Sequence, residues 1–249
     1  MKLLKWECLP QDMQTEAVRH YYAILEKKKC ALLFKRAFDV FASFLLLLVL
    51  SPVFLILAIL VKVDSRGPVF YRQERITQYG RKFRIFKFRT MVANADQLGT
   101  QVTVHNDSRI TRVGRFLRKT RLDEISQLID VLRGTLTFVG TRPEVEKYVR
   151  HYTDEMKATL LLPAGITSEA SIRYKDESAL LDAAGDAADK IYVQSILPSK
   201  MKYNLHALKT FRFWKDIKIM FMTVFAIFGK EYSDTLNADA VREKTEVLK

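Results

Sequence analysis

The sequence has only two cysteines, Cys8 and Cys30, among its 249 residues. They are not closely spaced, so the chain shows neither a disulfide framework nor a zinc-ligand pattern. This usage fits a reducing location that faces the cytosol. Internal repeats and low-complexity stretches are also missing from the sequence. Because hydrophobic residues make up 49% of the chain, we expect a real hydrophobic core rather than disorder.

Acidic residues are scarce as well. The chain has 28 aspartates and glutamates against 41 lysines and arginines, which gives a formal charge of +13. Such an excess indicates a polyanionic partner: nucleic acid, an anionic membrane surface or a phosphorylated substrate. The length allows one good-sized domain with an accessory segment.

One long stretch carries no charge at all. The 22 residues from Val40 to Val61 read VFASFLLLLVLSPVFLILAILV, and about 20 apolar residues are needed to cross a bilayer as a helix. The stretch lies too far from the N-terminus to be a signal peptide. A buried core helix is the alternative, which we disfavour because soluble helices rarely run so long without a polar face. The chain is therefore expected to be bound to a membrane.

Ser51-Pro52 lies at the midpoint of this apolar stretch and predicts a kink, since proline removes a backbone donor. Positive charge flanks both ends, which does not suit one end outside and one inside. We therefore expect a helix that enters, bends at Ser51-Pro52 and returns to the same face; an ordinary kinked span is the alternative. Asp39 at the near edge needs a partner, for which Lys35 and Arg36 are the candidates.

Shorter elements are predicted on either side. Residues 14–29 predict a helix that lies on the membrane surface or packs on the globular part, with Val18, Tyr21, Tyr22 and Leu25 at helical spacing. Two strands, at residues 69–71 and 83–88, predict a hairpin around a turn at Tyr79-Gly80. Further helices are expected at residues 91–98, 122–132, 144–159 and 179–197, with loops at 99–107 and 163–165. Gly134 is a plausible helix stop.

The stretch FRFWKDIKIMFMTVFAIF, Phe211 to Phe228, predicts one more helix. It suits an amphipathic helix half-buried among lipid headgroups, with Trp214 at the interface. A core helix docked on the domain explains the pattern equally well.

Basic residues are concentrated between Lys62 and Arg121, where 15 lysines and arginines face four acidic residues. Arginine dominates, and its planar fork suits two-point phosphate binding. Three interpretations are compatible with one another: a solvated face, attraction to anionic headgroups, and a phosphate-binding site.

Directly after this basic stretch, the sequence TRLDEISQL places Asp123 and Glu124 side by side. Carboxylates at the start of a helix are favoured by its dipole, so a purely structural pair is one interpretation. The other is chemical, because neighbouring helix positions point about 100° apart and permit two different jobs. One carboxylate can attack phosphorus while the other holds Mg²⁺, with arginines neutralising the transferring phosphoryl group. The pair, the arginines and the apolar stretch together indicate phosphoryl transfer at a bilayer surface.

Several motifs in a fixed order give the chain a resemblance to a known family. It resembles the bacterial sugar transferases, the monotopic phosphoglycosyl transferases that begin glycan assembly on a polyprenol carrier. The resemblance runs from about Lys35 to Thr223. The motifs are KRAFDV (35–40), the apolar stretch with Ser51-Pro52, GPVFYRQER (67–75), FKFRTM (86–91), DSRITRVGRFLRKTRLDE (107–124), QLIDVLRG (127–134), VGTRPE (139–144) and FWKDIKIMFMT (213–223).

The resemblance implies a mostly helical α/β fold associated with a membrane. Residues 1–34 would form an N-terminal extension, 35–62 a re-entrant membrane helix hinged at Ser51-Pro52, and 63–232 a small cytoplasmic catalytic domain with amphipathic surface helices. Residues 233–249 would be a C-terminal tail. The protein would be monotopic in the bacterial inner (cytoplasmic) membrane, facing the cytoplasm and contacting membrane lipids. Nucleic acid is not an expected partner, and a homodimer is left open.

The same resemblance implies a reaction. A sugar 1-phosphate would pass from a UDP-sugar to polyprenyl (undecaprenyl) phosphate through a covalent intermediate on Asp123, with release of UMP, to initiate cell-surface glycan assembly. Glu124 would act with Asp123 and bind Mg²⁺. The remaining substrate-binding residues would be Arg142 and Pro143 at the nucleotide and Lys87, Arg89 and Arg112 at phosphates.

The sequence also departs from the family pattern. Thr141, and Ser108 in many members, stand where the family has proline, and PAGITSEASIRY (163–174) has an extra Ala164. The intact Asp123-Glu124 pair preserves the expected reaction, while the changed segment leaves the sugar open. The rival interpretation is a membrane-tethered basic protein that binds anionic lipid or nucleic acid. A scaffold for glycan assembly is a weaker third option.

Overall fold

The computed structural model describes residues 1–93, 95, 107, 109–175, 177, 181 and 187–227. Helix α2 (Lys29–Val49) and helix α3 (Ser51–Asp64) hold the apolar stretch. Within the described ranges, no single helix is both long and apolar enough to cross a membrane, but this pair is when taken together, by length and composition. The two helices bend by 63° at Leu50. Pro52 lies in the first turn of α3, where its missing N–H leaves no hydrogen bond unmade. The predicted kink is confirmed.

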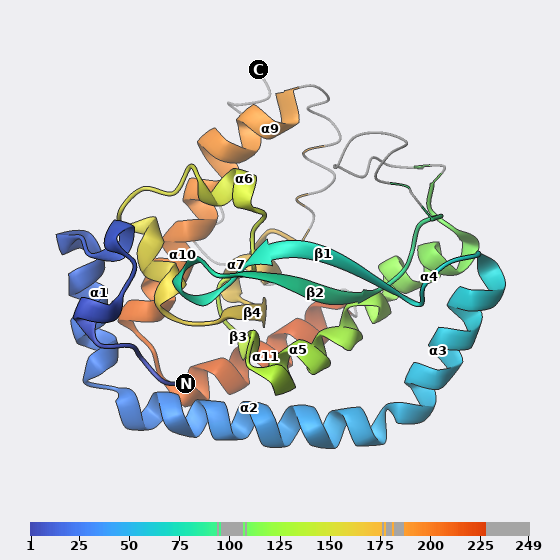
Figure 1. Cartoon of the computed structure of the whole chain (residues 1–249), viewed down its shortest axis with the longest axis horizontal. Helices are drawn as coiled ribbons and strands as arrows, with labels where there is room; N and C mark the ends of the chain where they lie inside the picture. Colours follow the sequence, from blue (N-terminus) through green and yellow to red (C-terminus); the bar gives the residue numbers. More distant parts are fainter. Residues whose placement is uncertain are drawn as a thin grey trace.

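Helix α2 lies along the base of the molecule beneath α5 (Leu128–Arg133) and α11 (Phe213–Ile227), as Figure 1 shows. Asp39 is buried and accepts a hydrogen bond of 2.8 Å from the Thr137 hydroxyl. Lys35 instead pairs with Asp216, and Arg36 donates to backbone carbonyls at the end of α5. The expectation that Lys35 or Arg36 would be the direct partner of Asp39 was wrong, because both cations reach acceptors on other elements.

The predicted hairpin is present and longer than expected. Strand β1 (Phe70–Ile76) pairs antiparallel with β2 (Lys82–Phe88) from Phe70↔Phe88 to Ile76↔Lys82. Tyr79 and Gly80 both have positive φ and make the turn. Helix α4 (Arg112–Thr120) follows, and its Gly114 packs against the Thr90 carbonyl, from which an added Cβ would lie only 2.0 Å away.

A second, parallel pair of strands forms further along the chain. β3 (Leu136–Val139) is fully buried and pairs with β4 (Ala164–Thr167), which begins within the segment predicted as a loop. That prediction was wrong because Gly165 lets the two backbones approach; its added Cβ would lie 2.1 Å from the Gly140 nitrogen. The helix predicted at residues 144–159 is also wrong. Only α6 (Glu146–Val149) and the 3₁₀ segment η6 (Met156–Leu161) are helical there.

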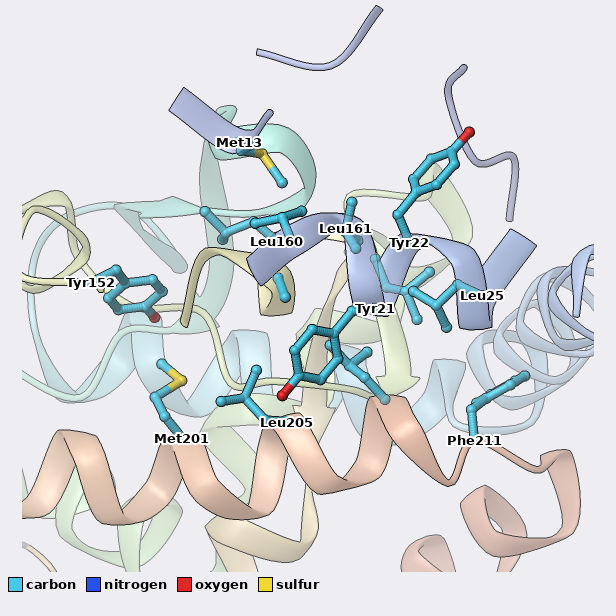
Figure 2. Packing of buried hydrophobic residues seen from close by; sticks show 14 of the residues in the cluster. Met13, Tyr21, Tyr22, Leu25, Tyr152, Leu160, Leu161, Met201, Leu205 and Phe211 are labelled. Carbon is cyan, nitrogen blue, oxygen red and sulfur yellow. The ribbon is translucent and has the colours of Figure 1, made fainter. Parts of the chain in front are cut away.

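Helix α1 (Glu16–Glu26) packs on the globular part, one of the two alternatives. Thr15 caps it, and Val18, Tyr21, Tyr22 and Leu25 are buried as predicted. Figure 2 shows Tyr21 and Leu25 in one hydrophobic cluster with Leu160 and Leu161 and with two further residues, Met201 and Leu205. The last two belong to α10 (Leu197–Lys209), which follows α7 (Glu169–Arg173), α9 (Ala188–Ile191) and a π-helical turn, η8 (Tyr192–Ile196).

Helix α11 is docked on the globular part, one of the two alternatives offered for it. Its buried Ile219 packs with the β3–β4 core, and Thr223 hydrogen bonds Thr167 of β4 at 2.7 Å. Its outer side leaves Trp214 and Phe221 exposed by 78% and 62%.

Four further expectations fall wholly or partly outside the described residues. In the helix expected at 91–98, the first residue, Met91, instead forms an isolated β-bridge with Ile110, and only residues 91–93 and 95 are described. Most of the loop at 99–107, the start of the helix at 179–197 and the tail at 233–249 lie outside.

Candidate active site

The acidic pair lies just after a sharp change of chain direction. Helix α4 ends at Arg121, which adopts a left-handed conformation with φ 57°. The next residues form a 3₁₀ segment, η5 (Leu122–Gln127), and α5 begins only at Leu128. The prediction that Asp123 and Glu124 open a continuous helix is therefore corrected. They occupy the first turn of η5, which packs against β2.

Glu124 is clamped by two cations that come from separate parts of the chain. Lys87 of β2 donates to Oε1 at 2.8 Å. Arg142, which follows β3, donates from Nη2 to Oε1 at 2.5 Å and from Nη1 to Oε2 at 3.3 Å. The Glu124 side chain is only 13% exposed. Lys87 is 20% and Arg142 33% exposed, so both cations are only partly shielded from water, and their charge-assisted hydrogen bonds to Glu124 are stronger than neutral ones.

These contacts fix the charges of the clamp. Burial by itself raises the pKa of Glu124, but the Arg142 and Lys87 charges and hydrogen bonds outweigh it and hold the pKa well below its ordinary value. The Glu124 charge in turn raises the pKa of Arg142. Glu124 is thus an anion, and Arg142 a cation, over the whole physiological pH range.

Asp123 has a different environment. It is 9% exposed, and among the described residues its Oδ1 atom has no hydrogen-bond partner. Burial, together with the negative charge of Glu124, raises the pKa of Asp123, while Lys87, Arg118 and Arg121 pull it down. A buried carboxylate oxygen left without a donor is costly, and such groups concentrate at functional sites.

The segment that carries Arg142 is held between the two sheets. The Gly140 amide donates to Thr167 and the Gly165 amide to Thr141. On the other side, Arg75 of β1 donates to the Pro143 carbonyl at 3.3 Å and to Gln73 Oε1 at 2.7 Å. Arg142 and Pro143 also line a small pocket together with Ile76, Thr77 and Tyr152.

The sequence motifs did not single out Arg75 and Gln73. Their signal is the hairpin register, which sets Gln73 opposite Ile85 and Tyr71 opposite Lys87. Residues directly opposite in an antiparallel pair share a face, so the hairpin turn already implied that Gln73 and Arg75 lie on the side of Lys87. Arg118 was also missed as an individual residue; it donates to Thr90 and its charge acts on Asp123.

The structure does not bring every predicted residue to this site. Arg89 is 5% exposed, and its guanidinium donates to Val61, Ser65 and Arg66 at the end of α3. Arg112 is exposed in the first turn of α4. The predicted contacts of Lys87, Arg142 and Pro143 with substrate stay predictions; Lys87 and Arg142 contact Glu124, and Pro143 is the residue after Arg142.

Mg²⁺ prefers one or two carboxylates together with phosphate oxygens, and the acidic pair offers carboxylate oxygens. Asp123 Oδ1 has its acceptor capacity unused, and each Glu124 oxygen has more than one acceptor site. Groups of three or more histidine, cysteine or acidic residues are absent from the described ranges. The pair therefore fits a magnesium ion that takes its remaining ligands from a substrate.

Comparison with known proteins gives the following. Residues 30–230 match a family model described as bacterial sugar transferase. The UDP-glucose:undecaprenyl-phosphate glucose-1-phosphate transferase of Escherichia coli (strain K12) is 36% identical over 201 residues, which cover 79% of this chain and 40% of that protein. The UDP-N-acetylgalactosamine-undecaprenyl-phosphate N-acetylgalactosaminephosphotransferase of Aeromonas hydrophila is 33% identical over 193 residues, covering 76% and 42%.

A third relative is the exopolysaccharide production protein PSS of Rhizobium leguminosarum bv. phaseoli. It is 46% identical over 112 residues, which cover 45% of this chain and 56% of that protein. The chain spans about two fifths of the length of the first two relatives.

Proposed function

The chain belongs to the bacterial sugar transferase family, and from this premise we propose that it transfers a sugar 1-phosphate from a UDP-sugar to polyprenyl (undecaprenyl) phosphate. The product would initiate assembly of a cell-surface glycan. One observation carries the proposal: a buried carboxylate with an unpartnered oxygen, Asp123, stands beside a carboxylate, Glu124, that holds two cations in place. This is the arrangement that attack on a phosphorylated substrate requires.

The transfer takes place in two substitution steps at the same phosphorus. An Asp123 oxygen attacks the phosphorus that bears the sugar, an O–P bond forms, and the bond to the bridging oxygen breaks so that UMP leaves with the electron pair. A phosphate oxygen of polyprenyl phosphate then attacks the same phosphorus. The bond to Asp123 breaks, the carboxylate is regenerated, and the lipid leaves with the sugar on a diphosphate.

Each neighbour of Asp123 has a role in this scheme. Arg142 and Lys87 lie where they can share their donors between Glu124 and the phosphate oxygens of the substrate. Arg142 and Pro143 would contact the nucleotide, since Arg142 lies beside the acidic pair. Glu124 would hold Mg²⁺, which, when bound, would neutralise the charge that develops on the phosphoryl group.

The membrane part of the proposal rests on the inverted faces of α2. Its buried side carries Lys35, Asp39 and Ser43, whereas its outer side exposes large apolar residues. In a water-soluble protein, charged side chains face the solvent and apolar side chains face the core, which is the reverse of this arrangement. In a bilayer, apolar side chains face the lipid and charged ones face the protein interior, as they do here. The exposed apolar residues of α2 and α3 are Leu33, Phe34, Val40, Phe41, Phe44, Leu45, Leu46, Leu48, Val49, Val53, Leu55, Ile56, Ile59, Leu60 and Val63.

The bend between α2 and α3 favours a re-entrant hairpin with both ends at the cytoplasmic face of the bacterial inner membrane. Native Cys30, exposed in the first turn of α2, tests the near end once Cys8 is replaced by serine. A Lys62→Cys substitution in a cysteine-free background tests the far end. In sealed inside-out vesicles, an impermeant maleimide should label both. Labelling of only one of them means that the helix spans the membrane.

The reaction itself is tested by mass spectrometry of the purified protein after incubation with Mg²⁺ and a panel of UDP-sugars, without lipid acceptor. The panel starts with UDP-glucose and UDP-N-acetylgalactosamine, the donors in the names of two relatives. A sugar-phosphate adduct on the peptide containing Asp123 is expected, and adding polyprenyl phosphate should remove it. If a folded protein gives no adduct and no lipid product with any donor, the transferase proposal fails. A basic protein that binds anionic lipid then becomes the better interpretation.

A further inference from the structure

Arg142 and Glu144 are separated by one proline, and their side chains make contacts on different sides of the segment. Arg142 reaches the Glu124 carboxylate in the active site. Glu144 is 7% exposed and lies against η8 and α10 instead, where it accepts a hydrogen bond of 2.5 Å from the Tyr192 hydroxyl. Because Pro143 has a fixed φ, the direction of one side chain constrains that of the other.

Glu144 belongs to a buried polar cluster. Lys200 of α10 lies 3.5 Å from Glu144 Oε1, donates to the Tyr192 hydroxyl at 3.1 Å and pairs with Glu177 at 2.9 Å. Lys200 is 6% exposed and Tyr192 3% exposed. Tyr192 opens the π-helical turn η8, a rare backbone form that is frequently found at functional sites.

The Glu144 backbone is connected to the active-site strand as well. Its carbonyl accepts from the Ile76 amide at the end of β1, one residue after Arg75. The Arg75 guanidinium donates to Pro143. A shift of Glu144 would therefore disturb both Arg142 and Arg75.

We propose that Glu144, Tyr192 and Lys200 are positioning residues, which anchor the segment 140–144 so that Arg142 stays on Glu124 and faces the donor substrate. The inference rests on the proposed function. It adds residues of η8 and α10 to those on which the active site depends.

A purely structural role explains this cluster less well. Buried ion pairs contribute little net stability compared with apolar groups of the same size, and their best attested use is to fix one geometry. The apolar core around α10 is already extensive, with Leu197, Met201, Leu205 and Leu208 buried in it.

The test compares two tyrosines with the same kind of hydrogen bond. Tyr192→Phe removes the bond to Glu144 and keeps the ring. Tyr21→Phe is the matched control, because the Tyr21 hydroxyl donates to Glu155 over the same 2.5 Å in the α1 interface. Glu144→Gln is a second variant, which removes the charge opposite Lys200 and keeps an acceptor for Tyr192.

Two readouts are measured on the full-length protein in detergent or vesicles. The first is hydrogen exchange at the Ile76 amide, which does not depend on activity. The second is kcat/KM for each substrate separately, since each value reports its own step of a two-step transfer. Tyr192→Phe and Glu144→Gln should each speed exchange at Ile76 and lower kcat/KM for the UDP-sugar by about tenfold, the size expected for a hydrogen bond to a charged group. The value for polyprenyl phosphate should stay within about twofold.

The outcomes separate the two proposals. If Tyr192→Phe behaves like Tyr21→Phe in both readouts, the positioning role is wrong. An equal fall in kcat/KM for both substrates also contradicts it, because that is the result of a general loss of folded protein. If the wild-type protein transfers no sugar at all while Ile76 exchange rises only in the Tyr192 and Glu144 variants, the anchoring of the segment stands and the transferase proposal fails.

Discussion

Arg142 and Glu124 form a two-point pair, with Nη2 of the guanidinium 2.5 Å from Oε1 and Nη1 3.3 Å from Oε2. Lys87 adds a single contact of 2.8 Å to Oε1. The two cations are not equivalent, because the planar fork of arginine fixes the orientation of the carboxylate, whereas an ammonium supplies only a charge. The orientation of the acidic pair therefore depends on a residue that lies 18 positions downstream.

Replacing Arg142 by lysine should lower kcat/KM for the UDP-sugar at least a hundredfold, although the net charge is unchanged. Lysine cannot make the two-point contact and leaves part of the Glu124 carboxylate without a donor. Steady-state kinetics against several donor concentrations measure the effect. The control is the same substitution at an exposed arginine, Arg133→Lys, which removes a guanidinium outside the site. It should leave kcat/KM within about twofold of the wild-type value.

Asp123→Asn should abolish turnover and the covalent adduct without lowering the melting temperature. Burial disfavours the charged form of Asp123, so a neutral isostere removes an unfavourable charge from the folded state. Thermal unfolding and mass spectrometry of the same sample measure both effects. An active Asp123→Asn protein rules out the nucleophile assignment.

The acid side of the pH–rate profile should reflect Asp123. Burial raises its pKa above the ordinary 3.8, so the ionised nucleophile is lost as the pH falls through a value higher than that. Stability follows Glu124 instead, since its pKa is lowered below 4.5. The stabilisation that ionised Glu124 gives the folded state is fully present above about pH 4.5. It is lost only as the pH falls through the lower pKa that Glu124 has in the folded protein. Adduct formation should therefore decline at a higher pH than the one at which unfolding begins. Coincident declines would contradict this order.

The part of the site that lies in one motif could be predicted from sequence, and the part that depends on three-dimensional pairing could not. Asp123 and Glu124 are adjacent in the chain, and arginine-rich surroundings already indicated phosphate chemistry. Glu144 gave no such signal, because its partners Tyr192 and Lys200 lie about 50 residues away, beyond any local pattern.

Arg89 and Arg112 were predicted for the same task, and the structure places them differently. Arg89→Met should lower the free energy of unfolding by about 2–4 kcal/mol, because it leaves Ser65 and Arg66 carbonyls without their charged donor. Arg112→Met should change stability by less than about 0.5 kcal/mol, since Arg112 is exposed. Chemical denaturation measures both. If Arg112 contacts a phosphate, the second variant will lose activity at unchanged stability.

The N-terminal residues that precede the family match at residue 30 should be needed for stability. Leu25 of α1 is fully buried against the α10 core, so Leu25→Ala should cost about 2–5 kcal/mol. Glu26→Ala, one residue further on the exposed side, is the matched control and should be nearly neutral. Equal melting temperatures for the two variants would mean that α1 is not part of the cooperative unit.

Helix periodicity was reliable where packing follows it, as for Val18 and Tyr21, both buried at the predicted spacing. It failed after Pro143. There the sequence pattern between Glu144 and Thr159 predicts one helix. In the structure the Glu144 carbonyl accepts a hydrogen bond from the Ile76 amide of β1, and only the short helices α6 and η6 form in this segment. Likewise, the pairing of β4 with β3 depends on a close approach at Gly165 that no spacing rule reveals.

Lys35, Asp39 and Ser43 follow one another at intervals of four residues, and this row gives α2 a fixed rotational phase. Each of the three is buried against the globular part, where Lys35 pairs with Asp216 and Asp39 accepts a hydrogen bond from Thr137. Exchanging one outward apolar side chain for another keeps the phase. A single inserted residue between Asp39 and Ser43 would turn everything beyond it by about 100°. It would move Ser51-Pro52 and aim the bend, and with it the whole of α3, in another direction. We therefore expect the helix to tolerate substitutions along its outer side but not the insertion or deletion of a residue.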